Sequence, residues 1–329
     1  MRSLYISQQG CYISLKQEQI IIKQGENILD KVQIPLLEQI LIFGKSQVTT
    51  QVITTCLQRD IPIAYLSRMG YCYGRVIAIE RGYRQLSRYQ QQLSILERLL
   101  IARQIVNAKI KNSRVILQRQ NRRKASEHLC STIQSLDYLC DRTFQVETTD
   151  QLLGIEGAAA AAYFSAFSEC IDNPEFVFSA RTRRPPGNPV NAMLSFGYQV
   201  LWNHILALVE LQGLDPYHAC LHQSSEKHAA LASDLIEEFR APIVDSLVLY
   251  LVNRGVINLG SDFEYRDGGC YLNDSGRKKY LKAFIQRMEQ SLQTDSGEQP
   301  RWDTLTQQIR AYKNCVYEPT MTYKPYLIR

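Results

Sequence analysis

The sequence lacks every arrangement of cysteine that indicates a crosslinked or zinc-stabilised protein. Its nine cysteines are scattered along the chain, and none belongs to a C-x-x-C pair. An odd count disfavours a disulfide framework, and a structural zinc site needs closely spaced ligands. We therefore expect reduced, mostly buried thiols.

Long apolar runs are also missing. The N-terminus "MRSLYISQQG" has no apolar core of the kind found in signal peptides, and no run of 18 apolar residues follows it. We expect no membrane span and a cytoplasmic protein. With 329 residues, 45% of them hydrophobic, the chain can bury a sizeable core, as two domains or one large one.

Acidic residues are absent from Arg98 to Lys124, where nine Lys or Arg residues occur. Such uneven basicity, in a chain of net charge +6, favours a polyanionic partner, with nucleic acid first. Basic side chains along one helix would follow a phosphate backbone and position DNA without reading its sequence; the alternative is the exposed face of a structural helix. The candidates are Lys109, Lys111, Arg114, Arg119, Arg122, Arg123 and Lys124, with a weaker second cluster at Arg277, Lys278, Lys279 and Lys282.

The pattern of apolar residues changes near residue 82. Before it, runs such as "CYISLKQEQIIIKQGEN" and "IPIAYLS" alternate like strands, and "SQVTTQVITTCLQR" suits a short helix. After it, helical spacing predicts helices over 85–118, 126–140, 150–168, 190–212, 228–254 and 275–293. The sequence predicts an α+β protein: a small N-terminal mainly-β domain (1–82) followed by a larger all-α C-terminal domain (83–329).

The stretch "LHQSSEKHAALASDLIEEFR" (221–240) brings a histidine near three acids. On a helix, Asp234 can share a face with either Glu237 or Glu238. Two carboxylates with His222 suit Mg²⁺ or Mn²⁺ better than zinc, which usually has several His or Cys ligands. The alternative is an amphipathic helix with a solvated acidic face.

A second acid, Glu156, lies among small residues in "LLGIEGAAAAAYFSAF". It is either part of a site with the first stretch or the N-terminal acid of an ordinary packing helix.

The rigid turn "RTRRPPGNPVN" carries Arg181, Arg183 and Arg184, whose forked guanidinium groups suit phosphate oxygens. A solvated basic loop is the alternative. We expect Asn188 and Asn191 to cap the helix that follows.

Four ordered segments carry a family resemblance: "LLGIEGAAAAAYF", "RTRRPPGNPVNAMLSFGY", "GLDPYHACLHQ" and "ASDLIEEFRAPIVDSLVLYLVNRG". With these, nearly the whole chain resembles the CRISPR-associated adaptation integrase family (Cas-one). The resemblance implies an Mg²⁺ or Mn²⁺ site at Glu156, His222, Asp234 and Glu237, and so selects Glu237 over Glu238. It leaves His204 as a helix-packing residue and His218 as a turn residue, and suggests that His228 contacts phosphate.

The resemblance also implies a function. A free 3′-hydroxyl on a captured DNA duplex would attack a phosphodiester at the edge of a CRISPR repeat, and with water instead the same site would act as an endonuclease. It implies a homodimer joined partly through the β domain, and a complex with the small Cas-two protein. The alternatives are a non-catalytic DNA-binding scaffold, a related nuclease or integrase acting on mobile-element or branched repair DNA, and, least favoured, a zinc hydrolase.

Overall fold

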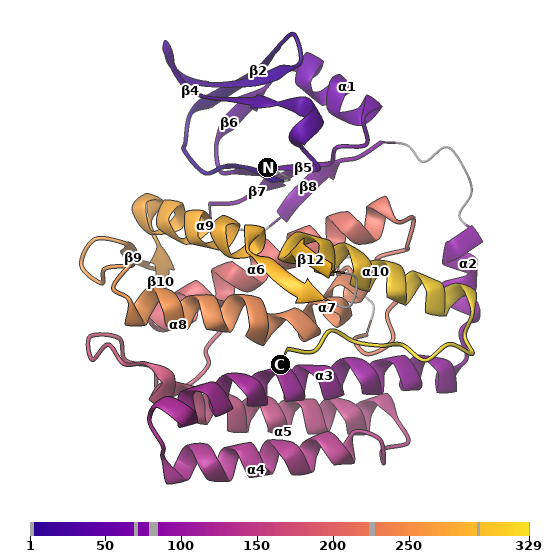
Figure 1. The fold of residues 1–329 in the computed structure, drawn as a ribbon. Helices are drawn as coiled ribbons and strands as arrows, with labels where there is room; N and C mark the ends of the chain where they lie inside the picture. The colour runs from indigo at the N-terminus through magenta and orange to yellow at the C-terminus, as the bar shows by residue number, and fades with distance from the viewer. Residues whose placement is uncertain (1–2, 69–71, 79–84, 224–227, 295–296, 329) are drawn as a thin grey trace.

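The computed structural model describes residues 3–68, 72–78, 85–223, 228–294 and 297–328. A strand-rich part comes first, and Figure 1 shows it on one side of a larger, mainly helical part. The predicted α+β class is confirmed. The predicted boundary at residues 82 and 83 lies outside the described residues, so the division into 1–82 and 83–329 stays a prediction.

The strand-rich part contains two four-stranded sheets and one helix. In one sheet the order is β1-β5-β7-β8, with β1, β5 and β7 mutually parallel and β8 antiparallel to β7. In the other the order is β4-β3-β2-β6, with antiparallel pairs except for the parallel β2–β6 pair. The elements are β1 (Ser3–Ile6), β2 (Cys11–Lys16), β3 (Gln19–Gln24), β4 (Asn27–Gln33), the 3₁₀ turn η1 (Ile34–Leu36), β5 (Gln39–Phe43), β6 (Ser46–Val48), α1 (Thr50–Gln58), β7 (Ile63–Leu66) and β8 (Cys72–Val76). The short helix predicted within residues 46–59 is α1.

Strand β5 is buried on both of its faces, which explains its unbroken apolar sequence. Because side chains alternate along a strand, Ile40 and Ile42 lie in the core of the strand-rich part, while Leu41 and Phe43 lie in the core of the helical part. The rings of Phe43 and Phe196 are 6.0 Å apart. The sheet containing β5 therefore separates the hydrophobic core of the strand-rich part from that of the helical part.

After one short helix, the second part continues with three long helices that lie side by side (Figure 1). It consists of α2 (Gln85–Gln92), α3 (Ile95–Arg123), α4 (Glu127–Arg142), α5 (Thr149–Phe167), η2 (Ser168–Cys170), α6 (Pro189–Leu211), α7 (Ala230–Ile236), η3 (Glu237–Phe239), η4 (Arg240–Asp245), α8 (Ser246–Asn253), β9 (Phe263–Arg266), β10 (Gly269–Leu272), α9 (Asp274–Glu289), β11 (Ser291–Thr294), β12 (Gly297–Pro300) and α10 (Arg301–Tyr317). Among the described helices, α6 has the length and composition of a membrane span, but 72% of its most apolar stretch is buried inside the protein.

The helical part differs from the prediction in several places. The helix expected over 85–118 is two helices, because Ser94 starts α3 with a capping box: its side chain accepts from the Glu97 N–H, and the Glu97 carboxylate accepts from the Ser94 N–H at 2.7 Å. Helix α10 and the hairpins β9–β10 and β11–β12 are not among the predicted elements. The cysteine prediction is confirmed, since all nine are free and seven are buried.

His204 of α6 joins the helical part to the sheet. It is fully buried, and its two ring nitrogens contact Tyr5 of β1 and Gln39 of β5. Because the Gln39 amide nitrogen can only donate, Nδ1 accepts and the neutral ring carries its proton on Nε2, facing the Tyr5 hydroxyl. Burial, with the nearby charge of Arg75, lowers the pKa of His204 to about 3. The helix-packing role predicted for His204 is confirmed.

Buried neutral histidine makes stability depend on pH. Below pH 6.5 the unfolded chain takes up a proton at this side chain, whereas the folded chain does so only near pH 3. The free energy of unfolding should therefore fall as the pH is lowered through this window, by a few kcal/mol from this residue. In thermal denaturation, the stability of His204→Gln should fall less steeply than that of wild type as the pH is lowered. The variant His128→Gln, at an exposed histidine, is the control. Parallel profiles for wild type and His204→Gln would contradict this account.

Candidate active site

The acidic stretch lies where one long helix changes its winding. Helix α7 passes into a 3₁₀ turn, η3, and a π-helical segment, η4, before α8 begins. Pro242 has no N–H, so the carbonyl of Glu238, four residues earlier, lacks the i+4 donor of an α-helix. The side-chain amide of Asn112, on α3, donates to that carbonyl at 2.8 Å instead. Irregular turns of this kind are frequent at functional sites.

Asp234 organises the loop that carries His222. Its carboxylate is fully buried and accepts from three successive backbone N–H groups, those of residues 220, 221 and 222, at 2.7–2.9 Å. It also pairs with His222 Nδ1 at 2.8 Å. The other ring nitrogen, Nε2, has no hydrogen-bond partner within the described residues. Asp234 thus fixes the imidazole through Nδ1 and leaves Nε2 available as a ligand. This arrangement is typical of histidines that bind metal.

Glu156 of α5 and Glu237 of η3 meet at one cation. The ammonium of Lys109, on α3, is ion-paired with both, and its Nζ lies 2.6 Å from Glu237 Oε2. Arg240 contacts the other oxygen of Glu237 at 3.0 Å. Burial alone would raise the pKa of Glu237, but Arg240, Lys109 and His222 outweigh it and lower the pKa to about 2. The carboxylate is therefore ionised at neutral pH.

His222 belongs to the same electrostatic group. Burial lowers its pKa, but the hydrogen bond and charge of Asp234, with the charge of Glu237, give a net rise. The four predicted metal residues thus form one neighbourhood: Glu156 and Glu237 share Lys109, and Asp234 holds His222 within electrostatic reach of Glu237.

This donor set fits a divalent cation in kind. Two carboxylates and an imidazole nitrogen suit Mg²⁺ or Mn²⁺, and the Lys109 ammonium already places one positive charge between the carboxylates. No group of three His, Cys, Asp or Glu side chains in the described part of the chain is arranged closely enough to hold a metal.

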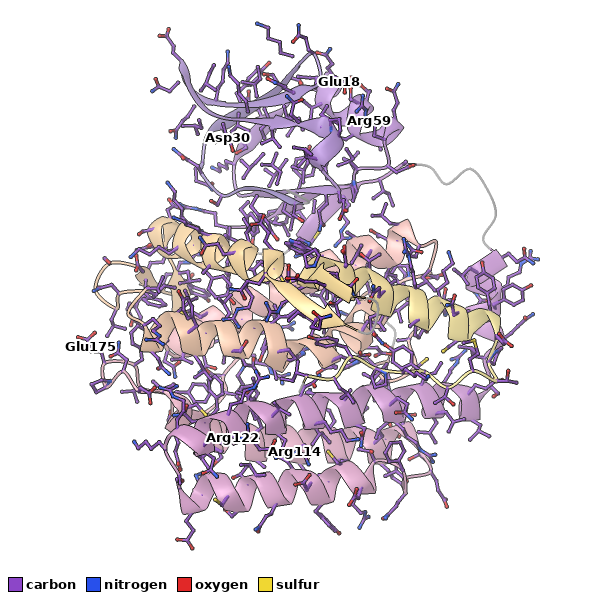
Figure 2. The ribbon with its side chains drawn as sticks, viewed as in Figure 1. Glu18, Asp30, Arg59, Arg114, Arg122 and Glu175 are labelled. Carbon is purple, nitrogen blue, oxygen red and sulfur yellow. The ribbon has the colours of Figure 1, made fainter. Side chains whose placement is uncertain are left out.

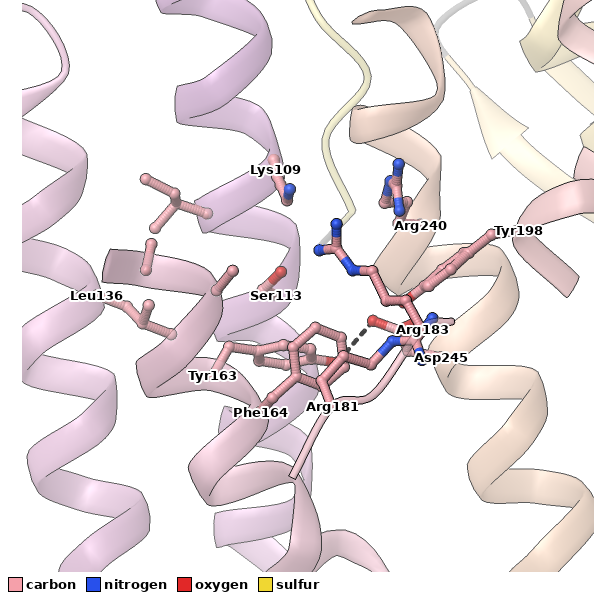
Figure 3. A pocket seen from close by; sticks show the side chains of 13 residues that line it. Lys109, Ser113, Leu136, Tyr163, Phe164, Arg181, Arg183, Tyr198, Arg240 and Asp245 are labelled. Atoms are coloured by element: carbon pink, nitrogen blue, oxygen red, sulfur yellow. Dashed lines mark hydrogen bonds between the residues drawn. The ribbon is translucent and has the colours of Figure 1, made fainter. Parts of the chain in front are cut away.

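A cavity lies beside the carboxylates. The basic side chains of Lys109, Arg183 and Arg240 line it together with Leu136 and Phe164, all labelled in Figure 3. Arg181 also lines the cavity, and its guanidinium group lies over the Tyr198 ring. The Arg240 guanidinium carbon also lies over that ring, 4.7 Å from the ring centroid. The cavity is thus cationic on the side nearest Glu237.

A buried carboxylate, Asp245, supports these cations. It accepts hydrogen bonds from Tyr163 at 3.0 Å and Tyr198 at 2.5 Å. Burial raises the pKa of Asp245 to about 6, against the lowering effect of both tyrosines, Arg240 and Arg181. Sequence reasoning missed Arg240, Tyr198 and Asp245. Arg240 had a visible signal, since it follows Glu237 by three residues and so shares its face.

The predicted basic helix is less free than its sequence suggests. Arg114 pairs with Asp137 of α4, and Figure 2 shows Arg114 and Arg122 along these helices. Arg123 pairs with Asp172 at 3.2 Å. Arg119 and Arg122 are exposed and Lys111 is half-buried. The helix therefore presents part of its charge to solvent and uses the rest internally.

The second basic cluster needs a correction. Arg277 is fully buried, where it donates to the Leu272 carbonyl and pairs with Asp274. It cannot reach a DNA backbone from there, so its predicted DNA contact is wrong. Lys279 pairs with the buried Asp262 at 2.6 Å, and Lys278 is exposed.

The arginine turn keeps two exposed cations. Arg183 and Arg184 are exposed and have no ion-pair partner within the described residues. Asn188 caps α6 as predicted, accepting from Asn191 N–H at 2.9 Å. Asn191 does not cap the helix. Its side chain accepts from Arg181 at 2.8 Å and so fixes the turn.

Two other histidines have local partners. His228 contacts the Ser233 hydroxyl at 2.9 Å and stacks on Trp202. His218 lies in the turn after α6, as predicted, and contacts Gln91 at 2.9 Å.

The C-terminal segment lies behind the acidic stretch. In Figure 1 it runs from α10 back along α3. Glu238 accepts from the Tyr323 hydroxyl and from Tyr326 N–H, and Asn112 donates to the Tyr326 carbonyl and accepts from Ile328 N–H. Burial raises the pKa of Glu238 to about 8, despite these hydrogen bonds. Glu238 thus binds the C-terminal segment while its neighbour Glu237 faces Lys109.

The chain belongs to the family described as CRISPR associated protein Cas1, whose sequence model matches residues 4–286. It is 34% identical over 307 residues to a CRISPR-associated endonuclease Cas1 of Chlorobaculum tepidum, covering 89% of this chain and 88% of that one. It is 35% identical over 301 residues to a Cas4 exonuclease/Cas1 endonuclease fusion of Geobacter sulfurreducens, covering 88% of this chain and 53% of the fusion. The chain spans about half the length of this fusion and of a similar one from Rhodospirillum rubrum.

Solved structures agree with this assignment. A Cas1 protein from Thermotoga maritima superposes with a TM-score of 0.82 at 26% identity, over 98% of both chains. A chain of a Cas6-RT-Cas1–Cas2 complex gives 0.81 at 27% identity, covering 98% of this chain and 36% of that one. A casposase bound to its integration product, at 22% identity and a TM-score of 0.84, shares the fold. The predicted family resemblance is confirmed.

Asn112 offers a direct test of the packing behind the acidic stretch. In Asn112→Ala the carbonyls of Glu238 and Tyr326 and the N–H of Ile328 lose this partner. Unpaired buried polar groups cost about 1–3 kcal/mol, so denaturant unfolding should show a loss of that order, and amide exchange should speed up over residues 323–328. Gln118→Ala on the same helix is the control, and equal stability of the two variants would contradict the assignment.

Proposed function

We propose that the chain is a divalent-metal-dependent DNA integrase of CRISPR adaptation. It would join the 3′-hydroxyl of a captured duplex to the edge of a CRISPR repeat, and would act as an endonuclease when water replaces that hydroxyl. Membership of the Cas1 family supports the proposal. The observation that carries it is the convergence of Glu156 and Glu237 on one positive charge beside His222 and a cationic cavity.

The roles of the acidic residues divide by their contacts. Glu156, Glu237 and Nε2 of His222 would hold Mg²⁺ or Mn²⁺. Asp234, whose two oxygens already accept four hydrogen bonds, would position His222 instead of binding the cation. When bound, the cation would neutralise charge on the reacting phosphate and stabilise the leaving oxygen.

The remaining side chains bind and orient DNA. The attacking 3′-oxygen forms the new bond to phosphorus, the bond to the leaving 3′-oxygen breaks, and that oxygen gains a proton as the attacking hydroxyl loses one. No protein nucleophile is needed, so the chain contributes position and charge. Arg183, Arg184 and Arg181 would contact phosphates near the reacting bond, with Lys111, Arg119 and Lys278 further along the duplex.

Two protein partners complete the proposal. A homodimer would form partly through the strand-rich part, where the edge strand β8 exposes Tyr73. A small Cas2 protein would be the second partner, supported by the likeness to the Cas1 portion of a Cas6-RT-Cas1–Cas2 complex.

The joining assay tests the site. Purified protein, with and without Cas2, is incubated with a labelled 3′-hydroxyl duplex and a supercoiled plasmid carrying a CRISPR repeat, in Mg²⁺, Mn²⁺ or EDTA. Glu156→Gln, His222→Gln and Glu237→Gln should each lose about 100-fold or more of the joining rate, and Asp234→Asn about 10–100-fold.

The control is the exposed carboxylate Glu175, labelled in Figure 2, whose Glu175→Gln variant should join DNA like wild type. If wild type and variants all bind DNA and none of them joins or cuts it, the non-catalytic DNA-binding scaffold is favoured. Equal joining to a plasmid that lacks the repeat would favour an integrase of mobile elements. Metal-dependent cutting without joining would leave a nuclease.

The arginine turn gives a separate prediction. Replacing Arg183 and Arg184 by glutamine should weaken binding to duplexes of any sequence about equally. It should also reduce the slope of log affinity against log salt by about one for each phosphate that the variant no longer neutralises. Fluorescence anisotropy at several salt concentrations measures both. The variant Arg277→Gln, at a buried arginine, should lower stability and leave the salt slope unchanged. An unchanged slope in the Arg183/Arg184 double variant would show that the turn is not part of the DNA-binding surface.

A further inference from the structure

Lys109 is a cation enclosed by the site. Its side chain is 14% exposed, and the two carboxylates paired with it, Glu156 and Glu237, are 19% and 3% exposed. The three side chains come from α3, α5 and η3, so the ammonium links three elements.

The two carboxylates need a positive charge between them. Like charges close together in a poorly solvated site repel, and an uncompensated buried carboxylate is costly. Glu237 has a second cation in Arg240, whereas the ion pair found for Glu156 in the described part of the chain is the one with Lys109. The lysine therefore allows both carboxylates to be ionised and close together without a metal.

We propose that Lys109 is an exchangeable internal cation: it holds Glu156 and Glu237 together before a divalent cation binds, and leaves both carboxylates when the cation arrives. This rests on the proposed metal centre. The ammonium donates to Glu156 and forms an ion pair with Glu237, so it occupies the position between the two carboxylates where the metal would bind. Two cations at that point would repel each other. Lysine suits exchange, because its charge sits on a flexible four-carbon stem.

The cavity gives the displaced ammonium a destination. Lys109 lines it together with Arg181, Arg183 and Arg240, as Figure 3 shows. A lysine turned into this space would add its charge to the side where DNA phosphate is proposed to bind. The DNA contact predicted for Lys109 would then form only after metal binding.

Mn²⁺ titration of the full chain without DNA tests the exchange. Calorimetry or electron paramagnetic resonance should show that Lys109→Gln binds Mn²⁺ about tenfold more tightly than wild type, because the competing charge is gone. Without metal the same variant should melt at a lower temperature. Lys111→Gln, on the same helix, is the control and should match wild type in both. Equal or weaker Mn²⁺ affinity of Lys109→Gln would overturn the proposal.

A labelling experiment on the wild type covers the case in which the variant does not fold. Acetylation by an N-hydroxysuccinimide ester, read by mass spectrometry, should modify Lys109 several-fold faster with saturating Mn²⁺, with Lys111 as internal reference. An unchanged Lys109 rate at saturation contradicts displacement. Absence of Mn²⁺ binding in both wild type and Lys109→Gln overturns the metal centre itself, and the exchange with it.

Discussion

Compensation of the buried Glu237 carboxylate is the constraint on which the site depends. A carboxylate that is 3% exposed is stable as an anion only with positive charge and hydrogen-bond donors around it. Lys109 comes from α3, and Arg240 comes from η4, the segment that follows Glu237 in the chain. His222 comes from a loop that Asp234 holds in place. Elements distant in sequence are thereby held to one point, and this point is also where a metal and a phosphate would be needed.

Two adjacent glutamates show how environment assigns roles. Glu237 and Glu238 are both buried, yet the first has a pKa of about 2 and the second about 8. Glu237 faces the two cations Lys109 and Arg240, whereas Glu238 faces tyrosines and backbone donors of the C-terminal segment. The change of winding before Pro242 separates their partners. One serves the candidate chemistry, and the other anchors the segment packed behind it.

The sequence was informative where a signal is local. The capping position of Asn188, the strand alternation and the acidic helix face all follow from near neighbours, and family motifs selected Glu237 over Glu238. It was misleading where partners come from elsewhere. The stretch from Arg98 to Lys124 has no acid of its own, but Asp137 and Asp172 compensate two of its arginines. Arg277 likewise reads as surface charge, although folding buries it against Asp274 and the Leu272 carbonyl.

The double-faced strand β5 has a consequence for synthesis of the chain. Chains are made from the N-terminus, and early parts begin to fold before later ones exist. The strand-rich part can bury Ile40 and Ile42 at once, but Leu41 and Phe43 belong to a core whose other half arrives with α6. Until then, one face of the nascent sheet exposes apolar side chains to water. Exposed apolar surface of this kind favours aggregation or the binding of a chaperone during synthesis.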